Sequence, residues 1–260
     1  MTGLNDNGGA AIIDVKSSIM SGMSHEMRTQ MNSIISLAFL LKDSSLNEVK
    51  KNDLVNHIHM TCKQMITVFE NFTELEFSIN KNTETEEEKC SVIDLLAMQF
   101  EEFRTLLISS GKQGIELINE IPNIDLSEII ISKTNVHKIL RCLYNNALHN
   151  TEFGYIKIGF SKNNSQLTFY VLDSGNAYEK TNKFFQSNDI KSSLELFNDL
   201  YSAVNISLAK KLIYSLNGSI DIKSNGANGS GVYFTIPVKN SAMPKSSFYK
   251  FVNSILFKNS

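Results

Sequence analysis

The stretch MSGMSHEMRTQMNS, residues 20–33, decides the fold because it sets a histidine within a long helical pattern. Apolar residues recur at steps of three and four through this region, which predicts a helix over residues 11–42. His25, Glu26 and Thr29 lie on the polar side of that helix. Two interpretations of His25 follow: a reactive group presented to a partner, or an ordinary solvated histidine.

A second helical pattern follows a break at KDSSLNE, residues 42–48. Its apolar seam alternates steps of four and three and has one polar member: Leu54, Ile58, Thr61, Met65, Val68, Phe72, Leu75 and Ile79. Two long helices with a short connection form an antiparallel hairpin, here residues 11–80. Because a hairpin of this size has little core of its own, we expect it to pair with a second copy as a four-helix bundle.

The composition changes sharply after this hairpin. Residues 81–90 are polar and acidic and carry no apolar periodicity, so they are expected to form a linker. Residues 91–240 mix amphipathic helices with alternating strands, which predicts an α+β layer with helices on one face of a mixed sheet. Residues 1–10 are expected to be disordered. Residues 241–260 form an amphipathic tail, for which packing on the domain is favoured over a partner or a membrane surface.

The overall composition is that of an ordinary globular protein, with 42% apolar and 20% charged residues. A net charge of −2 gives no field that would attract nucleic acid. Cys62, Cys90 and Cys142 lie far apart without metal-ligand spacing, so we expect free thiols in a reducing compartment. The start of the chain lacks the features of a signal peptide, and its apolar runs are short, which predicts a cytoplasmic protein or the cytoplasmic part of a larger one.

SHEMRTQMNSII, residues 24–35, resembles the H box of sensor histidine kinases, S-H-E-x-R-T-P-L-N-x-I-x. The order of segments also agrees with that family, and the resemblance covers residues 12–238. It implies a dimerisation and phosphotransfer hairpin followed by an α/β sandwich of the histidine kinase and Hsp90-like ATPase type. It further implies that His25 accepts a phosphoryl group and that Thr29 helps to place a water for dephosphorylation of the partner.

The chemistry of these residues agrees with the resemblance. An imidazole with one unprotonated nitrogen is a nucleophile, and it must be exposed so that the phosphorus can approach in line. Adjacent helical residues are about 100° apart, so Glu26 can orient the ring of His25 and take its proton without covering it. Gln30 replaces the family's proline, which predicts a straighter helix because proline kinks a helix.

Later motifs resemble the nucleotide-binding boxes of the family more weakly. CLYNNALHNT, residues 142–151, resembles the N box N-L-L-x-N-A-x-K-F-T, with Asn146 at the position of the Mg²⁺ ligand. Cys142 and His149 replace the asparagine and the lysine of that box, and a thiol is a poor ligand for Mg²⁺. Asn146 is thus either a ligand of Mg²⁺ and ATP or a polar residue on the surface of a helix.

DSGNA, residues 173–177, resembles the D-x-G-x-G box of the same family. Asp173 follows a predicted strand, where the family's aspartate accepts a hydrogen bond from the adenine amino group. Gly175 would let the backbone come close to the base. Ala177 replaces the second glycine, and DSG after a strand is also a common turn.

The glycine-rich loop of the family, G-x-G-L-G-L, is the clearest departure. Alignment of the following helix, residues 204–218, puts the three glycine positions on Tyr201, Ala203 and Asn205. Bare backbone N–H groups in such a loop bind phosphates, and side chains block that approach. The sequence therefore predicts that ATP binding is weak or lost.

Three functions are open at this point. The first is a phosphorelay protein in which His25 exchanges phosphate with a response-regulator aspartate, or helps to dephosphorylate it. The second is an autokinase in which Asn146, Asp173 and Gly175 suffice to bind ATP and Mg²⁺. The third is a pseudokinase scaffold that pairs with a true histidine kinase. The expected partners are a receiver domain and a second copy of the chain, and no nucleic acid.

Overall fold

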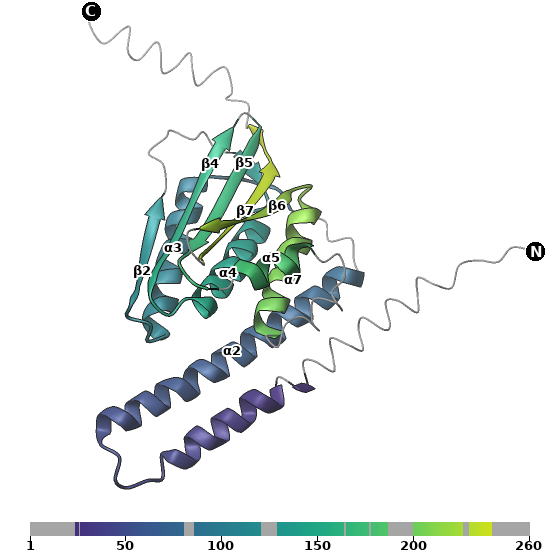
Figure 1. Cartoon of the computed structure of the whole chain (residues 1–260). Helices are drawn as coiled ribbons and strands as arrows, with labels where there is room; N and C mark the ends of the chain where they lie inside the picture. Colours follow the sequence, from purple (N-terminus) through teal and green to yellow (C-terminus); the bar gives the residue numbers. More distant parts are fainter. Residues whose placement is uncertain are drawn as a thin grey trace, which may run out of the picture.

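The computed structural model describes residues 24–25, 27–80, 86–120, 129–163, 165–176, 178–186, 200–225 and 229–240. The expected disordered start and the expected tail lie outside these ranges. A helical hairpin lies beneath an α/β domain (Figure 1). Within the described ranges, each helix is too short or too polar to serve as a membrane span.

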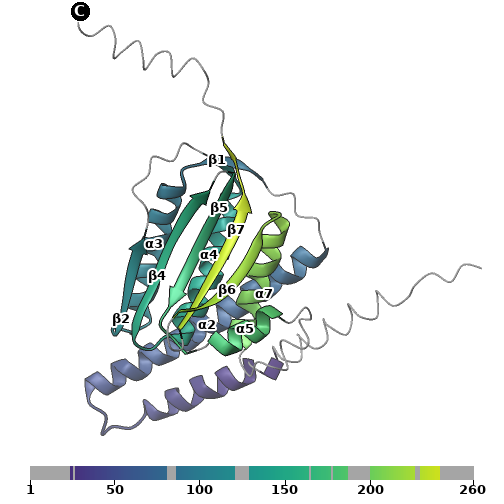
Figure 2. The same cartoon turned by 45° about the horizontal axis from the view of Figure 1, so that its top comes forward.

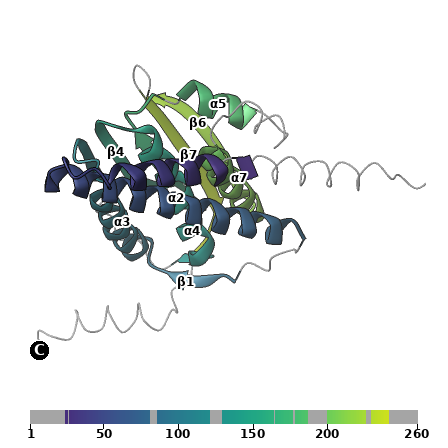
Figure 3. The ribbon, with the colours of Figure 1, turned by 90° about the horizontal axis from the view of Figure 1, so that it is seen from below.

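Two antiparallel helices form the hairpin. The first is helical over residues 27–40, and the second, α2, covers Glu48–Asn80. Asn47 caps α2, because its Oδ1 accepts a hydrogen bond from the backbone N–H of Lys50 at 2.9 Å. Figure 3 shows the two helices side by side below the domain, as the sequence pattern predicts.

A five-stranded mixed sheet forms one layer of the domain, in the order β2-β4-β5-β7-β6. Its strands are β2 (Ile115–Glu120), β4 (Gly154–Asn163), β5 (Gln166–Asp173), β6 (Ser219–Asn225) and β7 (Gly229–Pro237). β2 pairs with β4 in parallel, and the other pairs are antiparallel. Alternate residues of β5 are buried, as expected for a strand with one covered face.

Helices form the second layer, on one face of the sheet (Figure 2). They are α3 (Val92–Ser109), α4 (Lys133–Asn150) and α7 (Leu200–Ser215), and a short α5 (Tyr178–Gln186) lies against β6 and β7. Ser91 caps α3 by accepting a hydrogen bond from the N–H of Asp94 at 3.2 Å. Gly111, with a φ of 70°, follows the end of α3. This arrangement confirms the predicted α+β class.

A second, three-stranded sheet consists of β1 (Glu88–Cys90), β3 (Ile129–Ile131) and β8 (Lys239–Asn240). The last three residues of the expected linker at 81–90 therefore belong to a strand. Cys90 is buried and holds this strand on the domain. Three residues are too few for a strand periodicity to appear in the sequence, which explains the difference.

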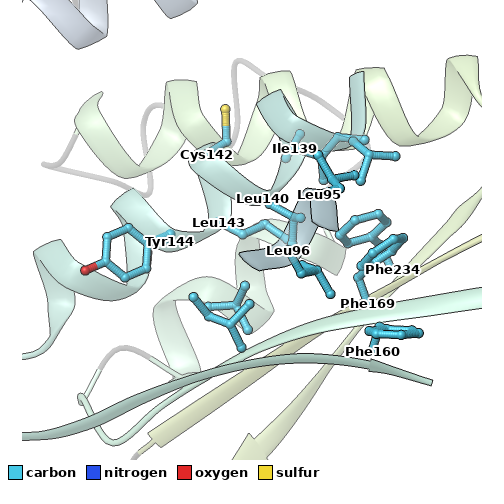
Figure 4. Close-up of a cluster of buried hydrophobic side chains, with 14 of the residues drawn as sticks. Leu95, Leu96, Ile139, Leu140, Cys142, Leu143, Tyr144, Phe160, Phe169 and Phe234 are labelled. Carbon is cyan, nitrogen blue, oxygen red and sulfur yellow. The ribbon is translucent and has the colours of Figure 1, made fainter. Parts of the chain in front are cut away.

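The core lies between the sheet and the helices. Phe160, Phe169 and Phe234 project from three neighbouring strands (Figure 4), and the ring centroids of Phe169 and Phe234 lie 5.0 Å apart. On the helical side, Phe103 of α3 stacks on Tyr144 of α4 with centroids 4.1 Å apart. These contacts bury large apolar areas and fix α4 on the sheet, so that the polar residues of α4 have defined positions.

Candidate functional site

His25 is exposed and belongs to the first helix of the hairpin. Thr29 follows one turn later, and its Oγ1 donates a hydrogen bond to the backbone carbonyl oxygen of His25 at 3.1 Å. This bond holds the threonine hydroxyl against the helix beside His25, whose side chain stays accessible to solvent. Glu26 lies outside the described residues, so its role stays a prediction.

Helical structure continues from Met27 through Gln30 to Leu40. Its half-buried side is made by Met27, Gln30, Ile34 and Leu37, at alternating steps of three and four. Arg28 is exposed beside His25. The polar side that carries His25 is thus separate from the side that packs within the hairpin.

Asp173 ends β5 and is buried, with 2% of its surface exposed. One carboxylate oxygen accepts hydrogen bonds from the backbone N–H groups of Gly175 at 2.9 Å and of Ser230 at 3.4 Å, and the other accepts from the hydroxyl of Ser230. Burial raises the pKa of the Asp173 carboxyl, and the hydrogen bonds from Ser230 and Gly175 lower it in part. A buried carboxyl of this kind can accept a hydrogen bond from the amino group of a base.

A chain of contacts leads from Asp173 to α4: Gly175 bonds to Asp173 and lies against Asn150, which in turn bonds to Asn146. A Cβ added to Gly175 would overlap the backbone carbonyl oxygen of Asn150. The side-chain N–H of Asn150 in turn donates to Oδ1 of Asn146 at 3.2 Å and to the backbone carbonyl oxygen of Asn146 at 2.8 Å. Gly175 is therefore required by the fold itself.

Asn146 is buried, with 3% of its surface exposed, so the interpretation as a surface residue is wrong. Cys142, one turn earlier on α4, is also buried, and its side chain points away from the sheet (Figure 4). Burial raises the pKa of the Cys142 thiol to about 12, so that the group stays protonated at neutral pH and offers no thiolate to a metal. Within the described residues, no group of three or more His, Cys, Asp or Glu side chains could hold a metal ion.

The expected glycine-loop positions lie inside a helix. α7 begins at Leu200, four residues before the start predicted from the sequence, and therefore includes Tyr201, Ala203 and Asn205. Ala203 and Asn205 are buried, with 2% and 0% of their surfaces exposed. Only Asn205 lies beyond the first turn, where backbone N–H groups bond within the helix, whereas Tyr201 and Ala203 carry side chains where a glycine loop presents bare backbone.

Side chains also fill the region next to the start of α7. The rings of Tyr201 and His149 lie with their centroids 5.0 Å apart. Both residues line a groove that Met60, Lys63 and Thr67 of α2 close from the other side. Among the described residues, Asp173, Gly175 and Asn150 thus form a polar cluster at the end of β5, whereas Tyr201 and His149 line the groove next to the start of α7.

Some residues of the site could not be found from the sequence. Ser230 contacts Asp173 from a strand far along the chain, and no motif marked it. Lys112 anchors the end of α4: its Nζ donates to the backbone carbonyl oxygens of Leu148 and Thr151, both at 2.9 Å. A lysine in the turn after α3 carries no signal of this role, because the contact depends on the packing of α3 beside α4.

Comparisons with known proteins find sensor kinases among the relatives of the chain. No protein-family model matches the chain. The chain is 26% identical over 241 residues to the autoinducer 2 sensor kinase/phosphatase LuxQ of Vibrio harveyi, which covers 86% of this chain and 27% of LuxQ. It is also 26% identical over 248 residues to the hybrid signal transduction protein dokA of Dictyostelium discoideum, covering 88% of this chain and 14% of dokA. The chain therefore spans about a quarter or less of these relatives.

Solved structures of histidine kinases share the fold. Histidine kinase ThkA in complex with the response regulator protein TrrA matches with a TM-score of 0.62 and 19% identity, over 89% of this chain and 64% of that chain. Full-length ShkA in complex with AMPPNP matches with a TM-score of 0.58 and 17% identity, over 88% of this chain and 47% of that chain. The chain is thus similar in sequence to two-component sensor kinases, and it shares its fold with histidine kinases of known structure.

Proposed function

We propose that the chain is a phosphorelay protein in which His25 exchanges a phosphoryl group with the aspartate of a response-regulator receiver domain. One observation carries this proposal: an exposed H-box histidine stands on a well-formed hairpin, while the positions of the phosphate loop lie inside α7. The phosphate on His25 then comes from a phosphorylated partner, and ATP binds weakly or not at all.

The transfer step needs only groups that the hairpin and the partner supply. An unprotonated ring nitrogen of His25 attacks the phosphorus of the aspartyl phosphate in line with the leaving oxygen. A P–N bond forms, the P–O bond to the carboxyl group breaks, and the aspartate leaves as a carboxylate with the electron pair. Glu26 takes the proton that the ring loses. The reverse sequence returns the phosphoryl group to the receiver.

Hydrolysis is the second outcome at the same surface. The hydroxyl of Thr29 lies against the backbone of His25, one turn along the same helix. A water held there by Thr29 attacks the aspartyl phosphate directly, and inorganic phosphate leaves. The name of the relative LuxQ records both kinase and phosphatase activity for that protein, which makes a dual role for this surface reasonable.

Exposed apolar side chains on the hairpin favour a dimer, which agrees with the proposed function. Beside the seam that packs inside the hairpin, the first helix exposes Met31, Ile35 and Phe39, and α2 exposes Ile66 and Phe69. These side chains are 51% to 69% exposed and recur at helical spacing. A second copy of the hairpin would cover these stripes and complete a four-helix bundle.

An autokinase is the second candidate. The cluster of Asp173, Gly175 and Asn146 favours it, because a base could still bind at that end. The γ-phosphate of ATP would then have to be held beside His25 without the backbone N–H groups of a glycine loop. For this reason we favour the phosphorelay protein over the autokinase.

Phosphotransfer from a receiver tests the proposal. Receiver domains encoded by the source genome are phosphorylated with a small-molecule phosphodonor and incubated with the full chain. We expect acid-labile phosphate on the wild type and faster loss of aspartyl phosphate from at least one receiver. His25→Gln should abolish the transfer, whereas His59→Gln, at an exposed position of α2, should leave it unchanged. Failure of every receiver to transfer phosphate or lose it faster would overturn the proposal.

A further inference from the structure

We infer that the start of α7 is a latch that fastens the α/β domain to α2, and that the latch is built from residues that replace the glycines of the family's phosphate loop. The inference stands on contacts between the two parts of the chain. It does not depend on the proposed chemistry of His25.

The first contact is a hydrogen bond between two carboxamides. Asn205 is fully buried, and its Oδ1 accepts a hydrogen bond from Nδ2 of Asn71 on α2 at 2.9 Å. Nδ2 of Asn205 donates to the backbone carbonyl oxygen of Tyr201 at 2.8 Å. The bond within α7 fixes the orientation of the carboxamide, and the bond to Asn71 joins the two parts of the chain. A glycine at position 205 could make neither bond.

The second contact is an ion pair one turn further along α2. Nζ of Lys138 on α4 donates to a carboxylate oxygen of Glu74, and both side chains are about one-third exposed. Asn71 and Glu74 are three residues apart, so they present neighbouring groups to the domain. The hydrogen bond and the ion pair therefore act on the same stretch of α2.

The third contact extends the interface toward the middle of α2. Tyr201 reaches the groove that Met60, Lys63 and Thr67 line, and His149 supports its ring. From Met60 to Glu74 the interface follows about 21 Å of helix. An interface of this length, with contacts from both α4 and α7, holds the hairpin and the domain as one unit.

The latch and a phosphate loop exclude each other. For residues 201–205 to adopt an open glycine-type loop, the first turn and a half of α7 would have to unwind. Asn205 would then leave Asn71, and Tyr201 would leave the groove. Two of the three residues at the glycine positions, Tyr201 and Asn205, thus make the interdomain contact, which fixes the domain on α2.

Hydrogen exchange of the full chain tests the latch. Asn71→Ala and Asn205→Ala should each raise the exchange rate of α2 amides between residues 60 and 75 about tenfold, since each removes one partner of a buried hydrogen bond. The double variant should exchange no faster than either single variant, because both remove the same bond. Asn56→Ala, at an exposed position of α2, is the matched control and should have no such effect.

The ion pair provides an independent test with its own rescue. Glu74→Lys and Lys138→Glu should each raise exchange in the same peptides, and the two changes together should restore it toward the wild-type rate. Equal exchange in Asn71→Ala and Asn56→Ala, or additive effects of Asn71→Ala and Asn205→Ala, would overturn the latch. Asn71 lies on α2, outside α7, so its result stands even if Asn205→Ala unfolds the start of α7.

Discussion

Asp173, the residue predicted to accept a hydrogen bond from adenine, has a defined buried environment although the expected glycine loop is absent. Its carboxyl is buried at the end of β5, and three hydrogen bonds from Gly175 and Ser230 compensate for only part of the lost hydration. The folded chain therefore carries an electrostatic cost at neutral pH. Such a cost is typical of binding sites and is not needed to build the fold.

This cost predicts a pH dependence of stability. The pKa of Asp173 in the folded state lies above its ordinary value of 3.8. Its contribution to the free energy of unfolding is therefore complete below pH 3.8 and is lost as the pH rises through the raised pKa. Asparagine does not ionise, so Asp173→Asn removes this decrease in stability. The stability of the variant relative to the wild type should therefore increase as the pH is raised from about 4 to about 8. Urea unfolding across this range measures the difference. Asp53→Asn, on the exposed side of α2, should show no such trend, and a pH-independent difference for Asp173→Asn would contradict the account.

At the scale of elements, the start of α7 separates this chain from the family pattern. A glycine-rich loop followed by a helix has become one continuous helix from Leu200 to Ser215. The sequence showed that the glycines are absent, and this was sufficient to predict the loss of the cradle. It did not show that the helix extends backward, because the buried side of Ala203 and Asn205 is defined only by α2 and α4, which are distant in sequence.

Glycine substitution at Ala203 tests that helical extension. Gly is about 1 kcal/mol less favourable than Ala in a helix interior, so Ala203→Gly should lower the free energy of unfolding by about that amount or slightly more. Denaturant unfolding measures it, and Ala97→Gly on the exposed side of α3 gives the reference cost. A neutral effect of Ala203→Gly would show that this position lies in a loop.

The contacts of Lys112 with the end of α4 give a second prediction at the scale of elements. Its ammonium group bonds to the backbone carbonyl oxygens of Leu148 and Thr151, which end α4, and pairs with Glu152 at 2.8 Å. Hydrogen bonds to a charged group contribute about 1.5–3 kcal/mol, so Lys112→Met should cost about 2 kcal/mol in denaturant unfolding. The exposed Lys89 provides the control variant, Lys89→Met. Equal free energies of unfolding for the two variants would contradict the role of Lys112 in stabilising the end of α4.

At the scale of the whole molecule, the exposed apolar stripes of the hairpin predict a dimer. Ile35 and Phe39 are 62% and 69% exposed, and burial of each would contribute about 1.5–3 kcal/mol. Ile35→Glu should therefore shift the chain from dimer to monomer in sedimentation velocity. Asn32→Glu adds the same charge at an exposed position of the same helix and should leave the dimer intact. A wild-type monomer at high concentration would contradict the bundle.

The sequence predicted most of the architecture because its patterns are local. Periodicity or motif predicted the two helices of the hairpin, the strands β4 and β5, the exposure of His25 and the place of Asp173 at the end of a strand. The parts that escaped prediction depend on contacts between distant segments. The short strand β1, the partner Ser230 and the contact of Asn71 with Asn205 each join residues more than 30 positions apart.

The central claim is that the phosphate on His25 comes from a receiver domain and not from ATP. One labelling measurement tests this claim most directly. The full chain is incubated either with γ-labelled ATP and Mg²⁺ or with a labelled receiver aspartyl phosphate, and acid-labile label on His25 is quantified by mass spectrometry and by comparison with His25→Gln. We predict label from the receiver and none from ATP. Label on His25 from ATP alone, at a rate comparable with transfer from the receiver, would contradict the account.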